Sequence, residues 1–186
     1  VLTLQPHNLR AQAALGRLLA VESQRQRVAT ILEPIYETQG AYADLARVLE
    51  IQLGDRDTEE AQASLLLRIG ELYETRLRDA DAAFSAYARA VEVDPAERLA
   101  REALARASSG RDAYRKRRAQ VLDAAVQATQ DVDVQIELLD ELARLYDEYL
   151  DDKAAAERCY DRLIELGDGR DDIVLAAARA LERIHQ

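Results

Sequence analysis

The sequence has no Trp and no Met, and it holds a single Phe and a single Cys among its 186 residues. One Cys excludes an intrachain disulfide and favours a reducing cytoplasm. The apolar residues, 48% of the chain, are mostly Ala, Leu, Val and Ile. This composition favours helix over strand and is sufficient to bury a core, so we expect an all-α fold.

Long apolar runs are also missing. None approaches the roughly 18 to 20 residues that a membrane-spanning helix needs, and no secretory leader pattern opens the chain. We therefore expect no membrane insertion. Because the sequence starts at Val1 and contains no Met, it reads as a piece of a longer or processed chain. A periplasmic location thus stays open beside the cytoplasmic one.

Basic side chains are in the minority, 25 against 35 acidic ones, which gives a net charge of -10. This charge repels phosphate backbones, so we expect no nucleic-acid ligand. It favours basic or mixed-charge protein surfaces as partners. The basic residues are Arg apart from two Lys, and together with the Ala-rich composition this usage favours a bacterial source.

Motifs that carry chemistry are absent too. Seven glycines form no phosphate-binding loop, and the acidic stretches "GDRDTEE" and "GDGRDD" lack the order of a calcium loop. His7 and His185 lie near opposite ends of the chain, and Cys159 falls at a position that predicts a small buried side chain. We therefore expect no catalytic residue, no cofactor and no metal, which means that the chain is not an enzyme.

What the sequence does contain is a repeat with a period of 73 residues. Across residues 40 to 94, 15 of 55 positions are identical to the residue 73 places later, without a gap. Apolar residues recur at helical spacing in both copies. One stripe comprises Leu66, Ile69, Gly70, Tyr73 and Leu77, and the other comprises Leu139, Leu142, Ala143, Tyr146 and Leu150.

This periodicity predicts antiparallel helix pairs that bury their apolar faces by stacking on one another. Asp57 and Asp94 are the expected N-caps of two helices, Gly40, Gly54, Gly110 and Gly167 are expected to end helices, and Pro34 is expected to kink or split one. The predicted helices span residues 7–20, 23–39, 41–53, 58–77, 80–93, 95–107, 112–129, 131–150, 153–166 and 171–185.

The spacing of Leu66, Ile69, Gly70 and Tyr73, followed by Ala83, Tyr87 and Pro95, resembles the tetratricopeptide repeat family. The resemblance is strongest over residues 58–95 and weakest over residues 95–129. It implies one right-handed α-solenoid of about ten helices over residues 1–186. This solenoid would be a fragment of a longer bacterial array. Its expected units are residues 7–53, 58–94, 95–129 and 131–167, with a terminal helix at 171–185.

The resemblance further implies a non-enzymatic scaffold whose first helices line a concave, protein-binding groove. The residues carried over to that groove are Ser64, Leu67, Glu71, Glu74, Thr75, Glu137, Asp140, Arg144, Asp147 and Glu148. Most are acidic or uncharged, so the implied ligand is another protein or peptide with a basic or amphipathic helical segment. The alternative is that these carboxylates only solvate a scaffold.

Two further features leave alternatives open. One is the basic run Arg115, Lys116, Arg117 and Arg118. Its side chains either face solvent, or bind an acidic partner or the chain's own acidic loops. The third alternative is that they contact nucleic acid, as in a helical-repeat nucleic-acid binder. Four consecutive residues span a whole helical turn, so they cannot all serve one contact. At the end of the chain, Ile173, Ala177, Leu181 and Ile184 form an apolar stripe. The stripe predicts a continuing array or self-association through helix 171–185.

Overall fold

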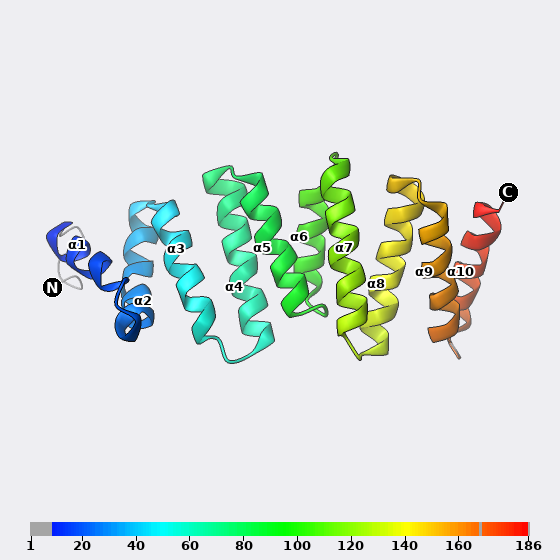
Figure 1. Ribbon diagram of the computed structural model, residues 1–186, viewed down its shortest axis with the longest axis horizontal. Helices are drawn as coiled ribbons and strands as arrows, with labels where there is room; N and C mark the ends of the chain where they lie inside the picture. Colours follow the sequence, from blue (N-terminus) through cyan, green and yellow to red (C-terminus); the bar gives the residue numbers. More distant parts are fainter. Residues whose placement is uncertain (1–8, 168, 186) are drawn as a thin grey trace. The chain divides into compact units, whose positions relative to one another are not determined.

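The computed structural model describes residues 9–167 and 169–185, which form ten α-helices and no strand (Figure 1). The all-α prediction is confirmed. Three short helical segments of other pitch, η1 (Leu53–Asp55), η2 (Tyr73–Leu77) and η3 (Leu145–Leu150), follow α3, α4 and α8. The α-helices are α1 (Leu9–Leu18), α2 (Glu22–Gln39), α3 (Tyr42–Gln52), α4 (Glu59–Leu72), α5 (Ala80–Val93), α6 (Arg98–Ser108), α7 (Asp112–Ala128), α8 (Val132–Arg144), α9 (Lys153–Leu166) and α10 (Asp171–Ile184).

The chain divides into two compact units, Val1–Ala86 and Tyr87–Gln186, and the boundary falls within α5. In the first unit, α1 packs on α2, α2 on α3 and α3 on α4. In the second, each helix from α6 to α10 likewise packs on the next along the chain. Consecutive packing of this kind is what the repeat predicts, whereas the right-handed solenoid stays a prediction.

Each unit buries the stripe that the repeat identifies. In the first unit Leu66 and Ile69 are buried, and Tyr73 is half-buried at the end of the stripe. In the second unit Leu142 is buried and Tyr146 is half-buried at the equivalent positions. The helical spacing therefore identifies the core face of both copies correctly.

Two predicted helix starts are wrong. The side chain that caps α4 is Thr58, whose Oγ1 accepts a hydrogen bond from the amide of Ala61 at 3.2 Å, and not Asp57. The helix expected from residue 95 begins instead at Arg98, with Glu97 as its cap. The Asp94 carboxylate accepts from the amide of Ala96 and thereby closes a turn ahead of the helix.

Pro34 does not split α2, which runs from Glu22 to Gln39 and ends at Gly40 in the left-handed conformation (φ 67°). Proline removes one backbone hydrogen bond, here the bond to the carbonyl of Thr30. Leu32 and Ile35 on either side of Pro34 are buried in the core of the first unit, and this packing holds the helix together.

The two copies share an unusual helix end. The wider turns η2 and η3 finish at Arg78 (φ 57°) and Asp151 (φ 51°), two residues in the left-handed conformation that are 73 positions apart. In both copies the next amide reaches back six residues, from Asp79 to the carbonyl of Tyr73 and from Asp152 to that of Tyr146. These bonds satisfy carbonyls that the helix end would otherwise leave without a donor.

No α-helix within the described ranges combines the length and the apolar character that crossing a bilayer requires.

Candidate functional site

Four of the predicted groove residues lie together on the second unit. Glu137, Asp140 and Arg144 of α8 and Glu148 of η3 line a pocket of about 430 Å³ that α9 and α10 complete. The same pocket has an apolar part, to which Ile136, Tyr160, Leu163, Ile173, Ala176, Ala177 and Ala180 contribute. We call this the α8–α10 pocket. It combines apolar surface with charge, as peptide-binding grooves do.

Arginine partners neutralise part of the acidic face. Asp140 pairs with Arg144 at 2.8 Å within α8, and Glu137 pairs with Arg101 of α6. Asp147, the fifth predicted groove residue of this copy, does not line the pocket. Its carboxylate accepts a hydrogen bond from Arg183 of α10 at 2.6 Å, and this bond raises the pKa of the guanidinium.

Two carboxylates on the pocket lining are not engaged in an ion pair. Glu148 and Asp172 form no ion pair within the described part of the chain, and both are exposed. Four carboxylates face two guanidinium groups on the lining, so the pocket keeps an acidic excess although Asp140 is paired. Tyr160 contributes its ring, and burial followed by the nearby Asp147 charge raises the pKa of its hydroxyl.

The first unit has a smaller pocket of about 360 Å³ formed by α2, α3, α4 and η2. Of the predicted groove residues of this copy, Glu71 and Thr75 line it, and the Thr75 hydroxyl donates to the carbonyl of Glu71 at 2.7 Å. Ser64, Leu67 and Glu74 lie on α4 and η2 outside this lining.

Arg68 lines this pocket and pairs with two carboxylates of α2. It pairs with Glu33 and, at 3.0 Å, with Glu37. Burial alone would raise the pKa of Glu33, but hydrogen bonds from Gln52 and Arg68 lower it below its ordinary value. Glu33 and Glu37 are therefore both paired within the chain.

The position of Arg68 carries the opposite charge in the second copy. The residue 73 places later is Glu141 on α8, which accepts hydrogen bonds from Arg101 of α6 and Arg118 of α7, both at 3.0 Å. Both residues tie the first helix of a repeat to helices that precede it. The first helix, however, supplies the cation in the first copy and the anion in the second.

The basic run on α7 divides among separate contacts. Arg115 pairs with Asp112 at 2.8 Å and stacks over the ring of Tyr149 in η3. Arg117 lies over the ring of Tyr114, at 5.7 Å from its centroid, and Lys116 is exposed. Arg118 bonds to Glu141, as described above. Two of the four residues therefore pair with carboxylates on helices rather than on loops.

The remaining candidates are placed as follows. Cys159 is buried, as the repeat predicts, and burial raises the pKa of its thiol to about 11. The Nε2 of His185 lies 3.3 Å from a carboxylate oxygen of Glu157, a neighbour that the sequence does not indicate, and His7 lies outside the described residues. Within those residues no group of three or more His, Cys, Asp or Glu side chains is placed to hold a metal ion.

The apolar stripe of α10 is largely covered by α9. Ala177 is buried, and Ile173, Leu181 and Ile184 are half-buried, whereas Leu175 on another face of the helix is 51% exposed.

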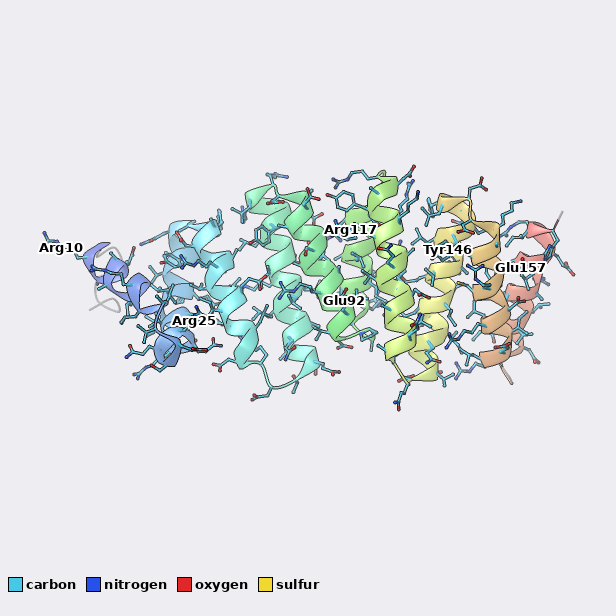
Figure 2. All side chains as sticks on the ribbon, viewed as in Figure 1. Arg10, Arg25, Glu92, Arg117, Tyr146 and Glu157 are labelled. Carbon is cyan, nitrogen blue, oxygen red and sulfur yellow. The ribbon has the colours of Figure 1, made fainter. Side chains whose placement is uncertain are left out.

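Sequence reasoning missed the arginines that organise these sites, namely Arg68, Arg101 and Arg183. Arg101 is the clearest case because its side chain is only 4% exposed. It lies next to Ala100 on the core side of α6, and a charge at such a position is the signal that could have identified it. Side chains that end in nitrogen and side chains that end in oxygen project from the helices of both units (Figure 2). A scan against models of known protein families finds no match, and a search of curated proteins finds no significant match.

Proposed function

We propose that the protein is a non-enzymatic scaffold of the tetratricopeptide kind that binds a basic, amphipathic helical segment of another protein. The observation that carries the proposal is the α8–α10 pocket, in which apolar side chains adjoin the unpaired carboxylates Glu148 and Asp172. An amphipathic helix places apolar residues on one face and Lys or Arg beside them, so it complements both parts of the pocket.

The charge balance favours a basic segment over an acidic one. Arg144 and Arg183 on the lining are already bound to Asp140 and Asp147. An acidic ligand would have to displace these partners, whereas a basic ligand meets Glu148 and Asp172, which form no ion pair within the described part of the chain. Charge complementarity of this kind contributes specificity and a faster association rate more than raw affinity.

Selection from a phage-displayed library of helical peptides tests the proposal. We expect enrichment of peptides with Lys or Arg beside an apolar stripe. The variant Glu148→Lys/Asp172→Lys should bind these peptides about tenfold more weakly, since two exposed attractions of about 0.2 to 1 kcal/mol each are replaced by repulsions of similar size.

The matched control is Asp161→Lys/Glu165→Lys on α9. Both residues are exposed, neither lines the pocket, and the change in net charge is the same. Affinity should survive in this control. Equal losses in both double variants would reduce the effect to overall charge, and enrichment of acidic peptides would overturn the proposal.

Self-association through α10 is a second candidate, which the exposed Leu175 favours. Sedimentation equilibrium tests it: Leu175→Glu should abolish a dimer that the unchanged protein forms at high concentration. A monomer at every concentration removes this candidate.

A further inference from the structure

The basic run on α7 contributes two guanidinium groups to a second cavity of the second unit. This cavity, of about 200 Å³, lies between the end of α6, the start of α7 and η3. Arg115, Arg118, Ser109 and Tyr149 provide its polar groups, and Leu145 provides apolar wall. None of these residues lines the α8–α10 pocket, so the two sites share no lining residue.

Hydrogen-bond donors dominate the lining of this cavity. The other three cavities considered in the described part of the chain each carry at least two carboxylates, but this lining has none. An arginine has five N–H donors and no acceptor. Arg115 uses a donor on Asp112 and Arg118 uses one on Glu141, which leaves further donors on both. The site is therefore rich in donors and poor in acceptors.

The two guanidinium groups are held in place by their neighbours. Arg115 stacks with its carbon atom Cζ 5.1 Å from the centre of the Tyr149 ring, and stacking uses the face of the group and keeps its N–H edges available. The Nε atom of Arg118 is buried and has no acceptor within the described residues. A buried donor without an acceptor is destabilising, so an acceptor brought within reach of this atom would be stabilising.

We propose that this cavity binds an oxyanion of the phosphate class through Arg115 and Arg118. Planar guanidinium groups match the oxygens of phosphate in pairs, and hydroxyls such as those of Ser109 and Tyr149 add neutral donors. The nearby carboxylates, Asp112 and Glu141, are each bound by an arginine. The volume suits a single phosphate group, either the free ion or the phosphate of a phosphoserine, and both present the same dianion.

The test is a titration of the full chain with inorganic phosphate, with sodium chloride adjusted to keep the ionic strength constant. Two-dimensional NMR of the arginine Nε–H groups reports on the site directly. The signals of Arg115 and Arg118 should shift and saturate, while that of Arg117, on the same helical turn but outside the cavity, should not. Shifts that spread over all arginines without saturating would overturn the proposal.

Variants sharpen this test. Arg115→Gln should weaken phosphate binding at least about tenfold, the loss expected for one charge-assisted contact. This substitution leaves the bond between Arg118 and Glu141 intact, so the fold is kept. Arg117→Gln is the matched control and should bind as the unchanged protein does. Unaltered affinity in Arg115→Gln would refute the site.

A second arm compares inorganic phosphate with a short peptide that contains phosphoserine and with its unphosphorylated form. Tighter binding of the phosphopeptide alone identifies a modified protein as the source of the phosphate. Binding of inorganic phosphate with no gain from the peptide identifies the free ion. Failure of both ligands overturns the inference and leaves the proposed function of the α8–α10 pocket untouched, because that pocket is tested with basic peptides.

Discussion

Arg101 shows how a charge is tolerated inside a helical core. Its side chain donates to Glu141 at 3.0 Å, to the carbonyl of Pro95 at 2.6 Å and to Glu137. Removing a guanidinium from water is costly unless its donors are satisfied by good partners. Here the partners come from α8 and from the turn ahead of α6, so one side chain links three segments of the second unit.

We expect Arg101→Ala to lower the free energy of unfolding by about 3 kcal/mol, because the substitution leaves two carboxylates without the buried partner that they share. Urea unfolding followed by circular dichroism measures the change. Arg98→Ala on the same helix is the control, since its guanidinium is 71% exposed and pairs only with Glu102. That control should cost less than about 1 kcal/mol. Similar losses in both variants would contradict the role of Arg101.

Cys159 predicts a loss of stability at alkaline pH. Burial raises the pKa of its thiol from 9.0 to about 11, so on raising the pH the unfolded chain loses this proton first. The stability that the thiol contributes is complete below pH 9 and is lost between pH 9 and about 11, up to about 2 kcal/mol. Urea unfolding across this window should show a steeper decline for the unchanged protein than for Cys159→Ala. Parallel curves would disprove the effect.

At the residue scale, burial could be predicted from the sequence and ion pairing could not. Cys159 aligns with Ala86 in the repeat, and both are buried. By contrast, Arg101 meets Glu137 and Glu141, which lie 36 and 40 positions away. A net charge of -10 does not say which carboxylates are already paired, so the pairs that Asp140 and Asp147 form with arginines could not be predicted from the sequence.

At the scale of the element, helix interiors followed from the sequence better than helix ends. The bounds of α5 and α9 coincide with the predicted ranges because their apolar spacing is unambiguous. The start of α6 was placed three residues early, because the motif at Asp94 and Pro95 suits a turn as well as a helix start. The left-handed ends at Arg78 and Asp151 carry no glycine, so no residue type announces them.

The helix end at Arg78 can be improved by substitution. A side chain in the left-handed conformation costs about 1 kcal/mol, and glycine does not carry this cost. Arg78→Gly should therefore raise the free energy of unfolding by about 0.5 to 1 kcal/mol, as measured by urea unfolding. Arg78→Ala keeps the strained conformation and should change stability by less than about 0.5 kcal/mol. A gain in the alanine variant would assign the effect to the charge instead.

At the scale of the whole molecule, the all-α class could be predicted from the composition and the consecutive packing from the 73-residue period, but the division into two units could not. The boundary between Ala86 and Tyr87 lies inside a continuous helix and has no composition signal. The boundary depends on which helices pack together. The repeat has the same spacing on both sides of it, so the sequence pattern does not indicate where it falls. The helices of each unit mostly contact their neighbours in the chain, so stability is expected to be local.

Hydrogen exchange tests that locality. Leu49→Ala removes a fully buried side chain from the core of the first unit and should cost about 3 kcal/mol. Amide exchange within α2, α3 and α4 should then accelerate more than exchange within α7, α8 and α9. Equal acceleration in both sets, measured by mass spectrometry, would show instead that the chain unfolds as one cooperative body.

The reversed polarity at Arg68 and Glu141 has a consequence for the ancestry of the two copies. If the first copy replaced the second, positions 137 and 141 would carry the serine and the arginine that stand at Ser64 and Arg68. The buried Arg101 would then lose both of its carboxylate partners and face a second cation. Recombination that exchanges one copy of the repeat for the other would therefore yield chains that fold poorly. In each copy the charge at this position matches the charges on the preceding helices. The two copies can therefore diverge further in sequence, but one cannot replace the other.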